Sequence, residues 1–143
     1  MSITTKAMIS VLIMAQDFKQ QGKIGELVNA AFVAGKSFGK RSPDESFGET
    51  VIDGNGSEHA ALTNMAHFVR KAGQSKLRTL RNEFAAMEGV EVIDYPEAAS
   101  PSTYEDYVNV LQTQSGDEIT YRAVHVFGPT EVVVPRTKSL SRL

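Results

Sequence analysis

The chain has 143 residues, 41% of them hydrophobic and 22% charged, which fits one soluble globular domain spanning residues 1–143. Fifteen basic and 17 acidic residues give a net charge of -2, so nucleic-acid binding would need a local basic patch. The absence of cysteine excludes disulfides, thiolate nucleophiles and cysteine metal sites. The longest apolar run, residues 7–15, is about half of the ~20 residues that span a bilayer, so a cytoplasmic protein without membrane contact is expected.

Two elements are predicted in the first 40 residues. Residues 8–14 are rich in β-branched and long apolar side chains, which predicts a strand covered on both faces. Apolar residues then recur at helical spacing up to Gly39, which predicts an amphipathic helix with one core-facing stripe. The stripe comprises Ile24, Leu27, Val28, Ala31, Phe32, Gly35 and Phe38. Small residues would let this helix lie close to the sheet: Gly25, Ala30, Ala31, Ala34 and Gly35.

The middle of the chain predicts a loop, a hairpin, a strand, a helix and a strand. Residues 40–46 lack periodicity and are expected to form a loop. The glycine-rich turn at residues 54–56 predicts a hairpin between residues 49–53 and the segment from residue 58 onward. Residues 66–72 are expected to form a strand. Ser75 is expected to cap the next helix, Gly89 to end it in a left-handed conformation, and residues 90–95 to form a strand. The apolar side of that helix carries Leu77, Leu80, Phe84 and Met87.

The last third of the sequence predicts a helix, then a strand, then a terminal helix. Ser102 and Glu105 have capping-box spacing before apolar residues at helical intervals. Residues 119–127 are expected to form the final strand, and a terminal helix should begin near Val134 with Pro135 in its first turn. Strands that alternate with helices predict an α/β sandwich with a mixed β-sheet flanked by helices.

Several short segments carry a resemblance to a known family. The chain has Gly22-Lys23 before its first predicted helix, Gly54-Asn55-Gly56 followed by His59, and Gly128-Pro129 before a tail that ends near Ser141. In this order the elements resemble the type II peptidyl-tRNA hydrolase fold. More closely, they resemble an uncharacterised bacterial family of unknown function built on that fold.

The resemblance implies two catalytic candidates. Lys23 would bind phosphate or position the substrate, and Asp94 would polarise water. The hydrolase motif also expects Gln and His on the first helix, but Leu27 and Ala30 stand at those positions. Thr103 follows Asp94 by nine residues where the motif has four. Without polar groups to orient water, ester hydrolysis lacks electrostatic support, so this activity is disfavoured.

The basic and histidine residues suggest further sites. No acidic residue occurs between His59 and Asn82, where five cations could contact the phosphates of tRNA or form an ordinary solvated helix face. The three histidines have no metal-ligand spacing, so neither a metal nor a cofactor is predicted. His125 is expected to be a partly buried, hydrogen-bonded residue of the final strand. The five cations are Arg70, Lys71, Lys76, Arg78 and Arg81.

Three functions therefore stay open. The first is an α/β domain that binds a small ligand or a partner without established catalysis. The second is a peptidyl-tRNA hydrolase that cleaves the ester between peptide and tRNA. The third is a dimerisation module, for which the partner is a second copy of the chain.

Overall fold

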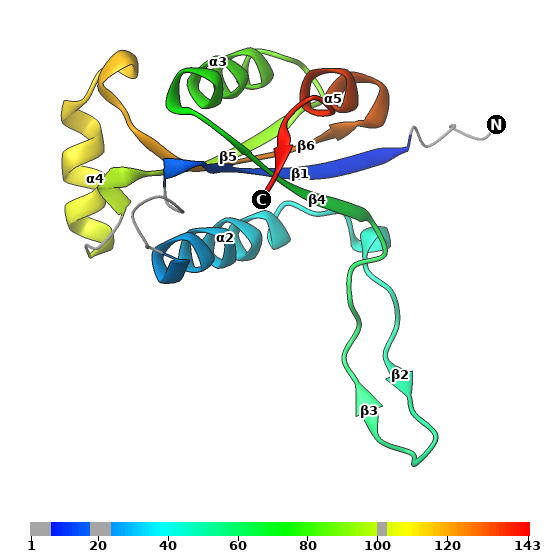
Figure 1. The fold of residues 1–143 in the computed structure, drawn as a ribbon. Coiled ribbons are helices and arrows are strands. Elements are labelled where there is room, and N and C mark those ends of the chain that lie inside the picture. The colour runs from blue at the N-terminus through cyan, green and yellow to red at the C-terminus, as the bar shows by residue number, and fades with distance from the viewer. Residues whose placement is uncertain (1–6, 18–23, 100–102) are drawn as a thin grey trace.

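The computed structural model describes residues 7–17, 24–99 and 103–143 (Figure 1). Short 3-10 turns occur at Asp44–Ser46, Glu97–Ala99 and Gly116–Glu118. The described strands are β1 (Met8–Ala15), β2 (Val51–Ile52), β3 (Glu58–His59), β4 (Ala66–Ala72), β5 (Glu91–Pro96), β6 (Tyr121–Pro129) and β7 (Ser141–Arg142). The described helices are α2 (Ile24–Gly39), α3 (Gln74–Ala85), α4 (Tyr104–Thr113) and α5 (Thr130–Thr137).

The main sheet is mixed, as predicted, with the strand order β5-β6-β1-β4-β7. β1 pairs in parallel with β4 and antiparallel with β6, so the most apolar strand lies at the centre. The register places Ser10 of β1 beside His67 of β4 on one side and beside Phe127 of β6 on the other. These pairings bring three distant parts of the chain together at one level of the sheet.

Helices cover both faces of the sheet: α2 lies on one face, and α3 and α5 lie on the other (Figure 1). Alternate side chains of β1 therefore enter two different apolar layers. The core includes Ile9, Val11 and Ile13, together with the fully buried Phe84 of α3. None of the described helices has the length and apolarity to cross a bilayer.

The predicted helix at residues 24–39 is present, but its core-facing stripe was predicted too wide. Leu27, Ala30, Ala34 and Phe38 are buried. In contrast, Ile24, Val28 and Phe32 are 64%, 57% and 72% exposed. A helix lying on a sheet buries only a narrow stripe, and α2 has more apolar residues than that stripe can hold.

The small residues of α2 also divide into two groups. Ala30 and Ala34 are buried against the sheet, as predicted. A Cβ atom added at Gly25 or Gly35 would meet no atom within 4 Å, so close packing does not explain these glycines.

Several predicted helix ends were wrong. α3 has Gly73 as its N-cap, two residues before the predicted cap Ser75, and it ends at Ala85, although Gly89 does have a positive φ of 81°. α4 is capped by Thr103, whose Oγ1 accepts a hydrogen bond from the Asp106 amide at 3.1 Å, while Ser102 lies outside the described residues.

The C-terminal segment also differs from the prediction. α5 begins at Thr130, directly after β6, and Pro135 lies inside it. Burial of Val133 and Thr137, one turn apart, holds this short helix against the sheet despite the missing proline N–H. The tail then forms β7, which was not predicted, because a two-residue strand has no detectable periodicity.

Two glycine substitutions should have opposite effects on stability. At Gly128 an added Cβ would lie 3.0 Å from Val90 Cγ2 and 3.3 Å from Val133 Cγ2, so Gly128→Ala should destabilise the fold by about 1–3 kcal/mol through overpacking. Gly35→Ala places its methyl group in open space on a helix and should stabilise by about 0.5–1 kcal/mol. Urea unfolding of both variants checks this; equal shifts in the same direction would contradict it.

Candidate functional site

A pocket of about 320 Å³ lies between α2 and the sheet, at the level of the Ser10–His67 register pair. Its wall is mostly apolar, and none of the described residues that line it is a Lys, Arg, Asp or Glu. Pockets of this kind, apolar with a few polar groups, are typical small-molecule sites. The lining residues are Ser10, Leu12, Ala31, Gly35, Phe38, Gly39, Ser42, Phe47, Thr63, His67, Phe68, Val69 and His125.

A buried serine and histidine form the polar floor of this pocket. Ser10 and His125 are only 2% and 4% exposed, and Ser10 Oγ lies 2.5 Å from His125 Nε2. The buried atom Nδ1 of His125 has no hydrogen-bond partner among the described residues. Whichever tautomer is present, the imidazole therefore keeps one donor or acceptor available, and burying such a group without a partner is costly.

Aromatic packing fixes the position of His125. The ring of Phe38, from the last turns of α2, lies with its centroid 4.3 Å from that of His125 and 5.0 Å from that of Phe127. Phe38 also contacts His67, in an edge-on arrangement with the centroids 6.1 Å apart. The end of α2 thus closes one side of the pocket and restricts the rotation of the imidazole.

Both histidines of the pocket are shifted toward the neutral form. Burial lowers the pKa of His125 to about 4, with a smaller contribution from the charge of His67. Burial also lowers the pKa of His67, whose Nε2 lies 3.1 Å from Thr63 Oγ1. At neutral pH the pocket therefore presents uncharged hydrogen-bonding groups.

Neither catalytic candidate inferred from the resemblance is among the described residues that line this pocket. Lys23 lies outside the described residues. Asp94, on β5, accepts a hydrogen bond from Arg81 Nε at 3.1 Å, so its carboxylate is already ion-paired on the side of α3. Asp94 also borders a separate, larger groove of about 670 Å³ between α2 and α4, near Tyr107.

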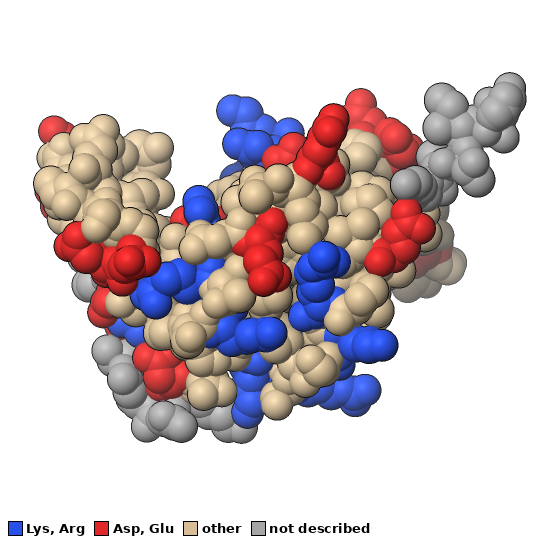
Figure 2. All heavy atoms as spheres, turned by 90° about the horizontal axis from the view of Figure 1, so that it is seen from above, with Lys and Arg blue, Asp and Glu red and all other residues tan. Residues whose placement is uncertain are grey.

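The five predicted phosphate-binding cations are divided between β4 and α3, and those with described contacts have different partners. Arg78 donates to the Ile119 carbonyl at 2.7 Å, and Arg81 pairs with Asp94. The guanidinium carbon of Arg70 lies 5.4 Å from the centroid of the Phe68 ring. The neighbouring Lys71 points to the opposite face of β4, because strand side chains alternate. Figure 2 shows basic and acidic side chains interspersed on the face that α3 and α5 cover. The contacts of Arg70, Arg78 and Arg81 therefore differ, and the described part of the chain does not gather the five cations into one patch.

The prediction for His125 is confirmed, since this side chain is buried and hydrogen-bonded. The partner residue, Ser10, was missed. One signal was available: Ser10 is the single polar residue within the apolar run of β1, and a buried hydroxyl needs a partner. Among the described residues, no three His, Asp or Glu side chains come together in a way that could hold a metal ion.

Comparisons with known proteins support the fold. A solved structure of a protein of unknown function from Agrobacterium strain C58 is similar to this chain, with a TM-score of 0.77 and 17% sequence identity. The alignment covers 95% of this chain and 97% of the Agrobacterium protein, and at this identity it shows a shared fold alone. None of the curated proteins matches the chain. Residues 10–143 match a family described as proteins of unknown function, DUF2000, and the chain belongs to that family.

Proposed function

We propose that the protein binds a small, neutral, largely apolar molecule in the pocket between α2 and the sheet. The pocket volume of about 320 Å³ is near the lower end of the range for small-molecule sites, about 300–1,000 Å³. The described residues of its wall are mostly apolar and carry no charged side chain, which favours a ligand without net charge, because an ion would lose its hydration there without a compensating partner.

The observation that carries this proposal is the buried Ser10–His125 pair. Two polar side chains at the floor of an apolar pocket are costly to fold unless their hydrogen bonds are satisfied, and His125 Nδ1 has no partner among the described residues. The polar end of a ligand could complete this hydrogen bonding, while its apolar part contacts Leu12, Ala31 and Phe38. A hydroxyl, carbonyl or heterocyclic N–H group fits this requirement.

Ligand-observed NMR with small neutral compounds tests the proposal. Indole and p-cresol are suitable probes, with benzoate as the charged counterpart. We expect the neutral probes to bind and to shift the backbone amide signals of α2, β1 and β6, and benzoate to bind at least about tenfold more weakly.

A matched pair of variants locates the binding. Gly35 lines the pocket and has open space beyond its Cα, so Gly35→Leu should fill the pocket and abolish probe binding. Gly25 has the same open surroundings on the same helix but does not line the pocket, so Gly25→Leu should leave binding unchanged. Binding that survives Gly35→Leu, or amide shifts confined to other elements, would overturn the proposal.

Peptidyl-tRNA hydrolase activity is the alternative, supported only by the resemblance of the sequence motifs. It would use Lys23 and Asp94 and would take tRNA as its partner. Hydrolysis of an N-blocked aminoacyl-tRNA, lost in a folded Lys23→Ala variant, would favour this alternative over the binding function. The cysteine-free composition is compatible with a reducing cytoplasm, which is the location we propose in either case.

A further inference from the structure

Two exposed surfaces of this molecule complement each other in charge and hydrophobicity. The first is the β2–β3 arm, residues 47–63, which projects from the body on the side of the sheet that carries α2 (Figure 1). The second is the α2 ridge, an exposed row at four-residue spacing on the same side, made of Ile24, Val28, Phe32 and Lys36 and continued by Lys40 beyond the helix.

Exposed apolar side chains concentrate on these two surfaces. Of the 13 large hydrophobic residues that are exposed in the described part of the chain, seven belong to the arm or the ridge. Monomeric proteins seldom leave apolar residues clustered in this way. The ridge contributes three of these seven residues, Ile24, Val28 and Phe32. The arm contributes the other four, Phe47, Val51, Ile52 and Leu62.

The charges of the two surfaces have opposite sign. Between residues 42 and 69 the chain has five acidic residues and no Lys or Arg, whereas the rest of the chain has 15 basic against 12 acidic residues. Glu49 and Glu58 are exposed acidic residues of the arm, and Lys36 and Lys40 are exposed basic residues of the ridge. Opposite charges beside apolar patches favour this pairing and disfavour arm-to-arm or ridge-to-ridge contact.

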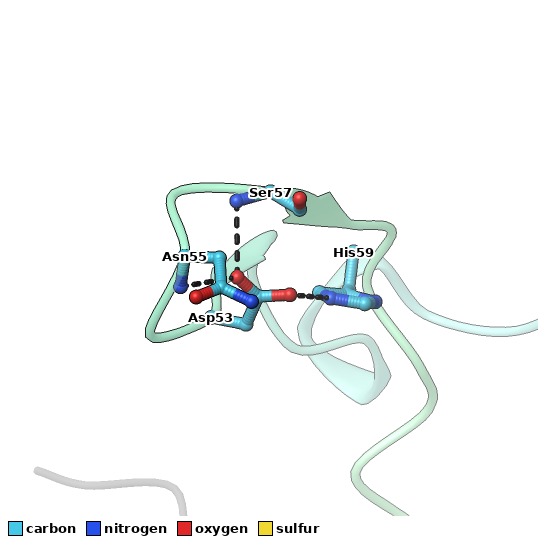
Figure 3. Close-up of polar contacts among 4 residues, drawn as sticks. All are labelled: Asp53, Asn55, Ser57 and His59. Carbon is cyan, nitrogen blue, oxygen red and sulfur yellow. Dashed lines mark hydrogen bonds and ion pairs between the residues drawn. The ribbon is translucent and has the colours of Figure 1, made fainter.

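The arm has an ordered tip and is hydrogen-bonded at its base, where the Gly48 amide donates to the Leu62 carbonyl at 2.8 Å. Asp53 Oδ1 accepts hydrogen bonds from the amides of Asn55 and Ser57, at 2.8 and 3.0 Å, and Oδ2 lies 2.8 Å from His59 Nε2 (Figure 3). The hydrogen bond from His59 is the largest contribution that lowers the pKa of Asp53. β2 and β3 are only two residues each, and an isolated two-stranded hairpin is marginally stable in water.

We infer that the partner of these surfaces is a second copy of this chain, in a two-fold dimer in which each arm lies along the α2 ridge of the other copy. In a two-fold dimer every contact occurs twice, so both arms and both ridges are covered at once. The apolar residues of the arm would pack on Ile24, Val28 and Phe32, and its carboxylates would lie near Lys36 and Lys40. An arm with a preformed tip loses less conformational entropy on docking.

A charge-swap experiment with the full chain tests this dimer by analytical ultracentrifugation. In the arm variant, Glu49→Lys with Glu58→Lys, both surfaces become basic; in the ridge variant, Lys36→Glu with Lys40→Glu, both become acidic. Each variant alone should dimerise at least about tenfold more weakly than the wild type. An equimolar mixture should recover dimers, because both of its arm–ridge contacts are again between opposite charges. Asp53 is left unchanged because it holds the turn.

Two controls separate this result from other effects. Lys76→Glu with Lys138→Glu changes the net charge as much as the ridge variant does, but at positions outside both surfaces, and should leave dimerisation unchanged. Circular dichroism checks that every variant is folded. The inference is overturned by a wild-type chain that stays monomeric at about 100 μM, by variants that dimerise as well as the wild type, or by a mixture of folded variants that stays monomeric.

Discussion

Replacing Phe38 by alanine is expected to lower the free energy of unfolding by about 3–5 kcal/mol, the largest effect that we predict for a single substitution outside the strands. Phe38 is 5% exposed although it lies next to the C-terminal end of α2. Its ring contacts the rings of His125, Phe127 and His67. Truncation would remove these contacts and leave a cavity that joins the pocket below α2.

Urea unfolding of Phe38→Ala measures this loss, and Phe32→Ala is the matched control. Phe32 is on the same helix but is 72% exposed, so its truncation should change stability by no more than about 0.5 kcal/mol. Both are measured at low protein concentration, where association of copies contributes least. Similar losses for the two variants would mean that α2 does not pack on the sheet through Phe38.

The strands and helices of this fold were largely predictable from the sequence, since most of them have clear periodicity. β1 and β4 begin where predicted: β1 is an apolar segment bounded by polar residues, and β4 ends at Ala72, directly before Gly73. α2 was predictable from its spacing and its terminal glycine. Helix starts were less predictable: several Ser and Thr residues precede α4, and the structure uses Thr103.

The choice of buried face on α2 was not predictable from the pattern alone. Apolar residues occupy more of the helix circumference than one contact with a sheet can cover, so periodicity does not say which of them remain exposed. The structure buries Leu27, Ala30, Ala34 and Phe38, and the small size of the two alanines lets the helix approach the sheet closely. Ile24, Val28 and Phe32 therefore lie outside, where we infer a second copy binds.

The candidate site was only partly predictable. The burial of His125 followed from its place in an apolar strand. Its pairing with Ser10 could not be derived, since the two residues are 115 positions apart and meet only through the register of β1 with β6. Asp94 was a catalytic candidate only because of its place in a family motif, and that motif does not predict its ion pair with Arg81.

Acidification from pH 7 to pH 5 is expected to destabilise the protein by about 2 kcal/mol through His125. Burial holds the pKa of the folded-state imidazole at about 4, below its ordinary value of 6.5. Between about pH 4 and pH 6.5 the unfolded chain binds a proton that the folded chain does not bind. The stability contributed by neutral His125 is therefore full above pH 6.5 and falls as the pH drops toward 4. The total loss would approach about 3 kcal/mol.

Urea unfolding at pH 7 and pH 5 checks this expectation in the wild type and in His125→Gln. Glutamine can still hydrogen-bond with Ser10 but does not titrate, so the variant should be less stable at pH 7 and much less dependent on pH. His59→Gln is the control, because His59 lies on the exposed arm. The pKa of His67 is also lowered by burial, so His67 adds to the loss with the same sign, and His67→Gln separates its share.

The pH range of the measurement excludes the carboxylates with shifted pKa values. Asp53 and Glu118 have pKa values lowered from 3.8 and 4.5, so the stability that they contribute is lost only at more acidic pH than the range from 7 to 5. A wild-type stability that is flat over this range would mean that the His125 imidazole is accessible to protons in the folded state. In that case the floor of the pocket would be hydrated and could carry charge, and the preference for a neutral ligand would lose its physical basis.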